Sequence, residues 1–562
     1  MSSYKKYKVS NNKTLMEQVT EYIMKMAVFI YLFAIFAIFP FYNENHYSKL
    51  GASKYHFFVV SSVIFLAVMI INSIFYSKSH FEKDIYLEKY GKFSITDKFA
   101  IAFLLITAVS NIFAMDTYVG FWGDPGWYMG LLAQTIFVML LFFISRFWEW
   151  DAIIIEVMMI AAACVFLIAI FQRFNIDLFD LYYFEKDGYR VHVNETDVEK
   201  FVSTLGQTSW YSGYEVLVIP FGMFWYFHDS KVVSRIFSGI FLAISACSIC
   251  TVNNDSAYVA MFGVFSVFFW FALEDNEKLL RLLEMVLIFL GSFRLIGILQ
   301  DLFPERRIKL ITGEEKITEF LNHSPIMAGL LIFLALIYIV LRMLWNSSNK
   351  TNNKTTEETE KRKNNIRLIR TVYIWLVVIC VWAVILLMIL TTNKKLPDWL
   401  SFLYNVGFFN FDYHWGNQRG FNWRYALKAI RVGKFKEWLI GVGPDNFKMC
   451  MTAHFSQDIR AFWGDRTLAC AHNEWLNMAV NEGILGLIAY AGIFATSLAR
   501  LGKTIKNEPM AMPFFAAVLS YVLYNIFCYQ QCISTTMIFI FMGMGEMIIL
   551  HSQKEMEKKV KK

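Results

Sequence analysis

Charged residues are scarce in this sequence. They make up 18% of its 562 residues, whereas hydrophobic residues make up 57%. A soluble chain of this length carries more charge and does not repeat long apolar runs. The scarcity of charge therefore excludes an ordinary soluble protein and indicates an all-α polytopic membrane protein, whose apolar helices cross a bilayer.

Nucleotide-binding motifs are also missing. The sequence has neither a P-loop nor a dinucleotide-binding GxGxxG element, which disfavours an ATP-driven pump. We expect no cofactor and no nucleic-acid partner. A cleavable signal peptide is not expected either, because the first apolar run is long enough to span a membrane and lacks an obvious cleavage site.

Cysteine is present, but not in a metal-binding arrangement. Six of the eight cysteines lie in apolar runs: Cys164, Cys247, Cys250, Cys380, Cys528 and Cys532. Cys247 and Cys250 form a CxxC pair without a second pair or a His cluster, so no metal site is predicted. Cys450 and Cys470 fall in the one long polar interval, where an oxidising compartment would allow them to pair.

Long apolar runs make up much of the sequence. A membrane-spanning helix needs about 20 such residues. By that measure about fourteen spans (12–14) are predicted, near residues 22–41, 57–76, 99–115, 129–147, 152–171, 211–227, 233–250, 257–273, 283–299, 325–345, 369–390, 475–498, 510–527 and 535–550. The predicted protein is thus a helical bundle with one large polar loop late in the chain.

Lysine and arginine indicate the orientation. They gather in the N-terminal tail, in alternate loops and in the C-terminal tail KEMEKKVKK. Because cytoplasmic segments carry the excess of these residues, both termini are predicted to be cytoplasmic. The polar intervals 172–209, 301–324 and 392–474 then face outward.

The chain is expected to divide into three parts. Residues 1–391 form an N-terminal transmembrane bundle, residues 392–474 an extracytoplasmic loop, and residues 475–562 the C-terminal helices with a basic cytoplasmic tail. Residues 346–365, NSSNKTNNKTTEETEKRKNN, are polar and of low complexity, which predicts a flexible cytoplasmic linker.

The polar interval begins with a pattern typical of a basic amphipathic helix over residues 419–439. The apolar stripe consists of Trp423, Leu427 and Ile430, and the basic stripe of Arg424, Lys428 and Arg431. Such a helix can anchor the chain in the headgroup layer. Alternatively, its basic face can hold an anionic lipid-linked substrate. Residues 441–444, GVGP, predict a tight turn that ends the helix.

His472 lies directly before the next apolar run. At a helix N-terminus the dipole lowers the pKa of an imidazole, which favours the neutral form that can accept a proton. A single His in this place can also be structural. Asn473, Asn477 and Asn481 repeat at every fourth position. We expect the deeper two to bond neighbouring helices and Asn473 with Glu474 to orient His472 or a substrate.

Four short motifs follow one another across about seventy residues. They are Arg419-Gly420-x-x-Trp423, Gly441-Val442-Gly443-Pro444-x-x-Phe447, Ala471-His472-Asn473-x-x-Leu476 and Glu482-Gly483-Ile484-Leu485-Gly486. Their order and spacing resemble the signature of the superfamily of O-antigen ligases and Wzy-type O-antigen polymerases. Residues 204–207, TLGQ, are similar to its TxGNxN-like element.

The resemblance implies an inverting, metal-independent glycosyltransferase of integral-membrane, GT-C-like architecture in the bacterial cytoplasmic membrane. The donor would be a glycan on undecaprenyl diphosphate, the acceptor a glycan or a lipid-linked core, and a flippase and a chain-length regulator possible partners. His472 would be the general base, and Arg419 would hold the diphosphate. Further substrate contacts would come from Arg424, Asn473, Glu474, Trp423, Lys428, Arg466 and Gln207.

The chain departs from the family where a second essential arginine is expected. Residues 251–256, TVNNDS, lack the Ser-Arg expected there, and residues 122–130 resemble an early family element without its arginine. The candidates for a second phosphate contact are Arg424, Arg460, Arg466, Arg306 and Arg307.

Other functions stay open at this point. A polysaccharide or lipid flippase, or another transporter, tends to show internal repeats and charged or broken central helices, whereas the polarity here lies in one outer loop. A non-catalytic membrane anchor leaves the conjunction of Arg419, the turn and His472 unexplained. Within the family, ligases, polymerases and protein O-oligosaccharyltransferases share the signature.

Overall fold

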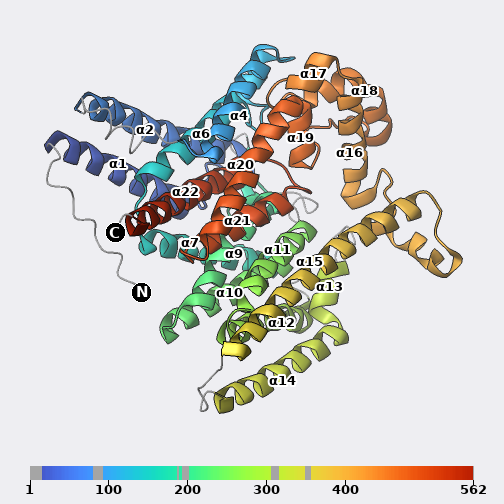
Figure 1. The fold of residues 1–562 in the computed structure, drawn as a ribbon. Coiled ribbons are helices and arrows are strands. Elements are labelled where there is room, and N and C mark those ends of the chain that lie inside the picture. The colour runs from blue at the N-terminus through green and yellow to red at the C-terminus, as the bar shows by residue number, and fades with distance from the viewer. Residues whose placement is uncertain are drawn as a thin grey trace.

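The computed structural model describes residues 15–79, 93–186, 189–192, 201–252, 254–304, 316–348 and 356–560. Within them, eleven helices are long and apolar enough to cross a membrane, which makes the chain an all-α, multi-pass membrane protein. These helices are α1 (Leu15–Phe33, continued by the π-helix η1, Ala34–Ile38), α2 (Leu50–Ser79), α4 (Ile95–Ile112), α7 (Ala152–Arg173), α10 (Val232–Val252), α11 (Asp255–Ala272), α12 (Asn276–Leu302), α14 (Pro325–Ser348), α15 (Thr356–Thr392), α20 (Gly483–Thr504) and α22 (Cys532–Val560) (Figure 1).

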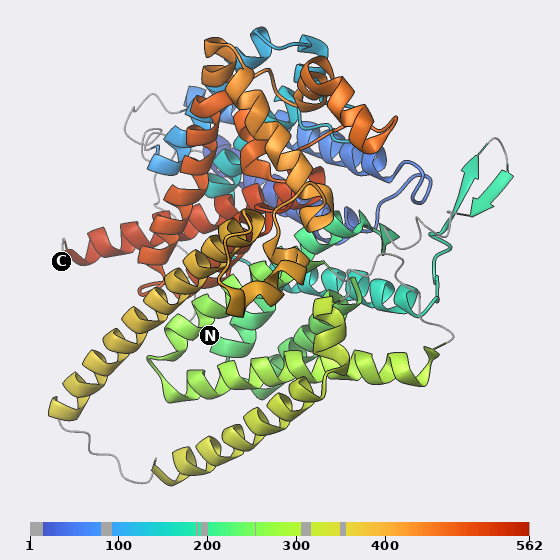
Figure 2. The same cartoon turned by 90° about the vertical axis from the view of Figure 1, so that its right-hand side faces the viewer.

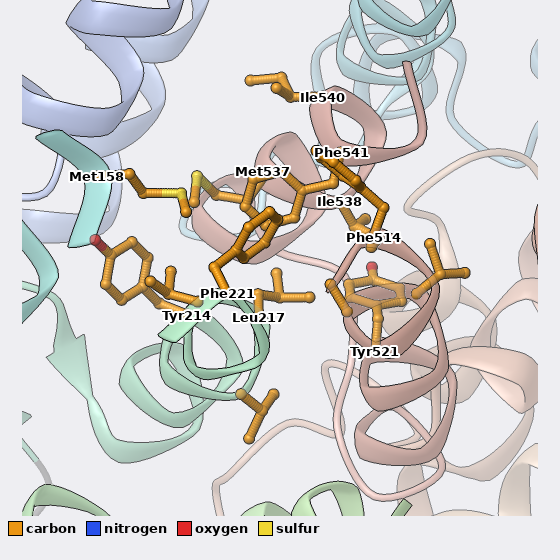
Figure 3. Packing of buried hydrophobic residues seen from close by; sticks show 14 of the residues in the cluster. Met158, Tyr214, Leu217, Phe221, Phe514, Tyr521, Met537, Ile538, Ile540 and Phe541 are labelled. Atoms are coloured by element: carbon orange, nitrogen blue, oxygen red, sulfur yellow. The ribbon is translucent and has the colours of Figure 1, made fainter. Parts of the chain in front are cut away.

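The centre of the bundle is built by three further helices around α22, of which α6 and α21 are shorter than the eleven above. They are α6 (Leu131–Phe147), α9 (Thr208–His228) and α21 (Ala511–Tyr524). Figure 3 shows Phe221 of α9 among side chains of α21 and α22, with ring centroids 5.1 Å from Phe514 and 4.9 Å from Phe541. Since α9 is buried on all sides, its sequence is apolar without a polar face.

Helices α14 and α15 lie at the edge of the bundle (Figures 1 and 2). Most of their apolar side chains are exposed, including Trp375 and Trp382. A hydrogen bond of 2.6 Å from the Tyr373 hydroxyl to Ser266 Oγ ties α15 to α11. Apolar flanks of this extent fit a hydrocarbon solvent rather than water.

The polar interval forms a unit of its own at one end of the bundle, at the upper right of Figure 1. It comprises the 3-10 helices η3 (Asp398–Asn405) and η4 (Gly407–Phe409) and the helices α16 (Trp415–Val432), α17 (Phe435–Ile440), α18 (Phe447–Trp463) and α19 (Glu474–Asn481). This outer unit has a second hydrophobic core, in which Phe421 stacks on Phe462 with centroids 4.3 Å apart.

Outside the long helices and the outer unit, the described residues form two short antiparallel hairpins and two small helices. Strand β1 (Tyr183–Lys186) pairs with β2 (Tyr189–His192), and Figure 2 shows this hairpin projecting from the body. Strand β3 (Phe201–Val202) pairs with β4 (Gly206–Gln207) directly before α9. Between α12 and α14 lies α13 (Lys316–His323), and between α4 and α6 the helical turn α5 (Thr117–Trp122).

Two expectations about local structure are wrong, and the question left open about Cys450 and Cys470 is answered. The amphipathic helix predicted over 419–439 is two helices, because α16 ends at Val432 and a bond from Lys434 N–H to the Glu437 carboxylate starts α17. The linker predicted at 346–365 is helical from Thr356 onward, within α15; residues 349–355 lie outside the described chain. Cys450 and Cys470 are buried free thiols.

The turn predicted at residues 441–444 is confirmed, and it does more than end α17. Gly441 and Gly443 have φ angles of 77° and 112°, which favour glycine. Val442 N–H and Gly443 N–H donate to the carbonyls of Val480 and Asn481 at 3.1 and 2.9 Å. The turn therefore fixes the end of α19, and with it the break at residues 482–483 that separates α19 from the membrane helix α20.

We predict that Gly441→Ala is far more destabilising than Gly464→Ala. Both glycines have positive φ, so each substitution costs about 1–2 kcal/mol of backbone strain. A Cβ at residue 441 would lie 2.1 Å from the Asn481 carbonyl oxygen, whereas one at residue 464 meets nothing within 4 Å. The total for Gly441→Ala should reach about 4 kcal/mol. Thermal unfolding of both variants in nanodiscs measures the difference, and equal unfolding temperatures would contradict the geometry.

Candidate functional site

Arg419 and His472, 53 positions apart in the sequence, meet the same loop after α21. Arg419 Nε donates to the Phe527 carbonyl at 2.9 Å. The ring of His472 packs edge-on against Tyr529, with centroids 5.1 Å apart. The two side chains are close enough for the Arg419 charge to lower the pKa of His472. The structure thus brings together the cation and the base that the sequence singles out.

A left-handed turn places Arg419. Gly416, Asn417 and Gln418 all have positive φ angles, and the regular part of α16 begins only after them. The Arg419 guanidinium donates a second bond, of 2.8 Å, to the Gly416 carbonyl. Strained backbone of this kind persists only where the surroundings enforce it, and it clusters at functional sites.

His472 also sits on strained backbone, with a φ of 49°. Its ring is half-buried, and no hydrogen bond to either ring nitrogen is present within the described residues. Burial lowers the pKa of His472 to about 3, and the charge of Arg419 contributes in the same direction. The imidazole is therefore neutral at physiological pH, with a lone pair free to accept a proton.

Tyr529 links several parts of the site. Besides contacting His472, its hydroxyl donates to Gln207 Oε1 at 2.7 Å. Its ring also meets Trp127 edge-on at 4.5 Å. Gln207, expected as a substrate contact, thus lies behind Tyr529 and supports it. Tyr529 itself had no motif to identify it in the sequence.

Trp423 and Asn473 have defined positioning roles. Trp423 Nε1 donates to the His472 carbonyl at 3.4 Å, and its ring stacks over Phe527. The Asn473 side chain caps α19 by accepting from Leu476 N–H at 3.0 Å. Trp423 thus contacts the backbone of His472, and Asn473, the next residue along the chain, starts the helix that follows it.

Glu474 is buried beneath the site rather than exposed in it. The hydroxyls of Tyr490 and Tyr521 donate to its carboxyl group at 2.5 and 3.0 Å. Burial raises the pKa of Glu474 to about 8, an effect that these two hydrogen bonds partly offset. Glu474 is therefore a neutral acid at pH 7 that fixes α19 to α20 and α21.

Three basic residues predicted as substrate contacts lie outside this group. Arg424 donates to the Phe411 carbonyl and lies over the rings of Phe411 and Tyr413. Lys428 is exposed, with its ammonium 4.1 Å from the centre of the Tyr425 ring. Arg466 is exposed in the loop before His472, without a contact that ties it to the site.

Another arginine was missed by the sequence motifs. Arg173, at the end of α7, donates to the carbonyls of Thr251 and Val252, at the loop where the family pattern expected an arginine. It comes from a different helix, so no local motif could reveal it. Of the earlier candidates, Arg460 is exposed on α18, and Arg306 and Arg307 lie outside the described residues.

Within the described chain, no group of three or more His, Cys, Asp or Glu side chains is arranged to hold a metal ion. Comparison of the sequence with the profiles of known protein families, and with curated proteins, gives no match. The functional assignment therefore depends on the site itself.

We predict that Glu474 makes the protein less stable as the pH rises. Its folded pKa, about 8, lies above the ordinary value of 4.5, so the folded state binds the proton more tightly than the unfolded state. The stabilising contribution is complete below pH 4.5 and is lost as the pH rises through 8. The unfolding temperature should fall from pH 6 to 9 less steeply in Glu474→Gln than in the parent protein. The exposed Glu557→Gln serves as the control and should keep the parent slope.

Proposed function

We propose that this protein transfers a glycan from an undecaprenyl-diphosphate-linked donor to a glycan or lipid-linked acceptor at the outer face of the bacterial cytoplasmic membrane. The observation that supports this most is the meeting of Arg419 with a neutral, unbonded His472 at the end of a bundle of apolar helices. The product would be a surface polysaccharide, made by polymerisation or ligation.

The reaction proposed is an inverting displacement. His472 accepts the proton of the acceptor hydroxyl, whose oxygen attacks the anomeric carbon of the donor. The bond from that carbon to the diphosphate oxygen breaks, and the electron pair leaves with the diphosphate. The donor is already activated, so the protein has to supply a base and to stabilise the charge that develops on the leaving group.

Arg419 suits the diphosphate for a specific reason. A guanidinium has five N–H groups, of which the two bonds to Phe527 and Gly416 use two. Both partners are neutral carbonyls, and three N–H groups remain for phosphate oxygens. Arg173 is the candidate for the second phosphate contact, in place of the arginine that the family pattern has and this chain lacks at residues 251–256, because its guanidinium bonds the carbonyls of Thr251 and Val252.

His472 suits the acceptor hydroxyl. Its lowered pKa keeps it in the basic form over the whole physiological range. The Arg419 charge disfavours the protonated ring, and a diphosphate bound at Arg419 would offset that charge and so strengthen His472 as a base.

The proposal includes the membrane topology. About fourteen spans in a GT-C-like arrangement, with both termini in the cytoplasm, would place residues 392–474 outside, where the diphosphate of the donor meets the headgroup layer. A flippase that delivers the donor and a chain-length regulator are the proposed partners.

The direct test is His472→Ala in a strain that lacks the native gene. Loss of the general base should reduce glycan transfer by about 10²–10⁴-fold. Arg419→Ala should reduce it by about 10²–10³-fold, as expected when a charge-stabilising donor is removed. The readout is the rate of polymer formation in membranes supplied with lipid-linked oligosaccharide.

His454→Ala is the matched control, since His454 is an exposed histidine of the same outer unit. It should retain the parent rate, and all three variants should reach the membrane in equal amounts. Full activity in His472→Ala would show that the proposal is wrong.

A further inference from the structure

A small cavity lies beneath the candidate site. It is enclosed by α19, the turn at residues 441–446, the start of α6 and the loop after α21. Its empty space is about 430 Å³, of which about 20 Å³ can be occupied by the centre of a water molecule. That is room for a water molecule or two, or for one small substituent of a larger molecule. Tyr529 lines the cavity and also contacts His472, so the cavity and the site share a wall.

Most polar groups in the cavity wall are already hydrogen-bonded to one another. Gln134 Nε2 donates to Gln530 Oε1 at 2.8 Å, and Gln530 Nε2 donates to the Tyr490 hydroxyl at 2.8 Å. The Tyr490 hydroxyl in turn donates to Glu474. This chain closes one side of the cavity with side chains that are bonded to one another.

Two acceptors in the wall differ from the rest. Asn481 Oδ1 and Glu482 Oε2 are buried without a hydrogen bond of regular geometry, although the Thr107 hydroxyl lies beside Glu482; the two residues are only 6% and 2% exposed. Asn477, one turn earlier, accepts from Ala471 N–H. The expectation that Asn477 and Asn481 bond neighbouring helices is therefore wrong for both side-chain oxygens, because Asn477 accepts from the loop before its own helix and the Asn481 oxygen has no donor. A buried acceptor without a donor costs free energy, so an occupant of the cavity must supply donors.

The chemistry of the wall limits that occupant. Asp445, Glu474 and Glu482 all line the cavity, and no Lys, Arg or His is among the lining residues that the structure describes. Without a cation in the wall, an anionic substituent such as a phosphate would be buried without a counter-charge. The Asp445 carboxylate is engaged by the N–H groups of Asp124 and Met129. A neutral hydroxyl group, which can both donate and accept, fits the Asn481 oxygen and the Glu482 carboxyl group best.

We propose that this cavity is a subsite for a hydroxyl-bearing substituent of the glycan, held by Asn481 and Glu482, with water in its place when no glycan is bound. The inference rests on the proposed function, because it supposes that the molecule reaching His472 is a sugar. Neighbouring substituents of one sugar ring are close together, so a ring whose reacting hydroxyl meets His472 can direct another into the adjoining cavity. The partly buried ring of Trp127 at the edge of the cavity offers an apolar face to the same sugar.

The test measures binding rather than catalysis. Full-length protein in nanodiscs is mixed with methyl β-glucopyranoside as the probe, and binding is followed by saturation-transfer NMR. Asn481→Ala removes an acceptor, and Ala469→Leu fills the cavity from its wall. Each should weaken binding about tenfold, the factor that corresponds to the loss of about 1.4 kcal/mol. Ala461→Leu, at an exposed position of α18, should bind as the parent protein does.

Several outcomes would overturn the proposal. Absence of binding to the parent protein, or equal binding to all variants, means that the cavity holds water only. Thermal unfolding distinguishes a loss of binding from a loss of folding. Because the side-chain oxygen of Asn481 makes no hydrogen bond, Asn481→Ala should unfold near the parent temperature. A lower temperature with unchanged binding also counts against the subsite.

The two proposals fail separately. Transfer is read from His472→Ala, and binding of the glucoside is read from Asn481→Ala and Ala469→Leu. If transfer persists in that variant while Ala469→Leu still loses the glucoside, the proposed reaction is wrong and the subsite stands. If His472→Ala abolishes transfer but the cavity variants bind normally, the subsite is wrong and the reaction stands.

Discussion

The pairing of the turn at residues 441–446 with the end of α19 is the interaction on which the site depends. Two backbone hydrogen bonds join the turn to Val480 and Asn481, and the Val442 carbonyl accepts from Met115 N–H beyond α4. The Asp445 carboxylate holds the loop before α6 through two further N–H groups. One short turn therefore fixes the outer ends of membrane helices that are far apart in sequence, and α19 carries His472 at its start.

The backbone around Arg419 and His472 is strained, and most polar side chains there carry no charge. Gln418 and His472 both adopt left-handed backbone conformations, which residues other than glycine rarely do. Gln418 directly precedes Arg419, and His472 is the partner of Arg419 in the site. Two polar groups of the site are uncharged at neutral pH. The imidazole of His472 is neutral because its pKa is lowered, and the carboxyl group of Glu474 is neutral because its pKa is raised. Arg419 is bound through carbonyls, so its charge remains available to a ligand.

The sequence predicts the helical membrane class because hydropathy alone determines it. It predicts the turn at residues 441–444 because two glycines and a proline within four residues do not continue a helix. It also identifies Arg419 and His472 through spaced motifs. It could not place Tyr529, Arg173 or the free Asn481 oxygen, since these depend on contacts between distant helices. The amphipathic pattern was misleading at Gly433, where a local carboxylate cap outweighs the periodicity. The motifs indicate a glycan transferase, which stays a proposal.

The outer unit has a hydrophobic core separate from that of the bundle, and α19 contributes to both, through Val480 on one side and Met478 on the other. Substitutions within α16 and α18 can therefore be compensated inside the smaller core without repacking the membrane helices. A substitution in the short segment that both cores share, by contrast, disturbs the packing of the outer unit and of the bundle at once.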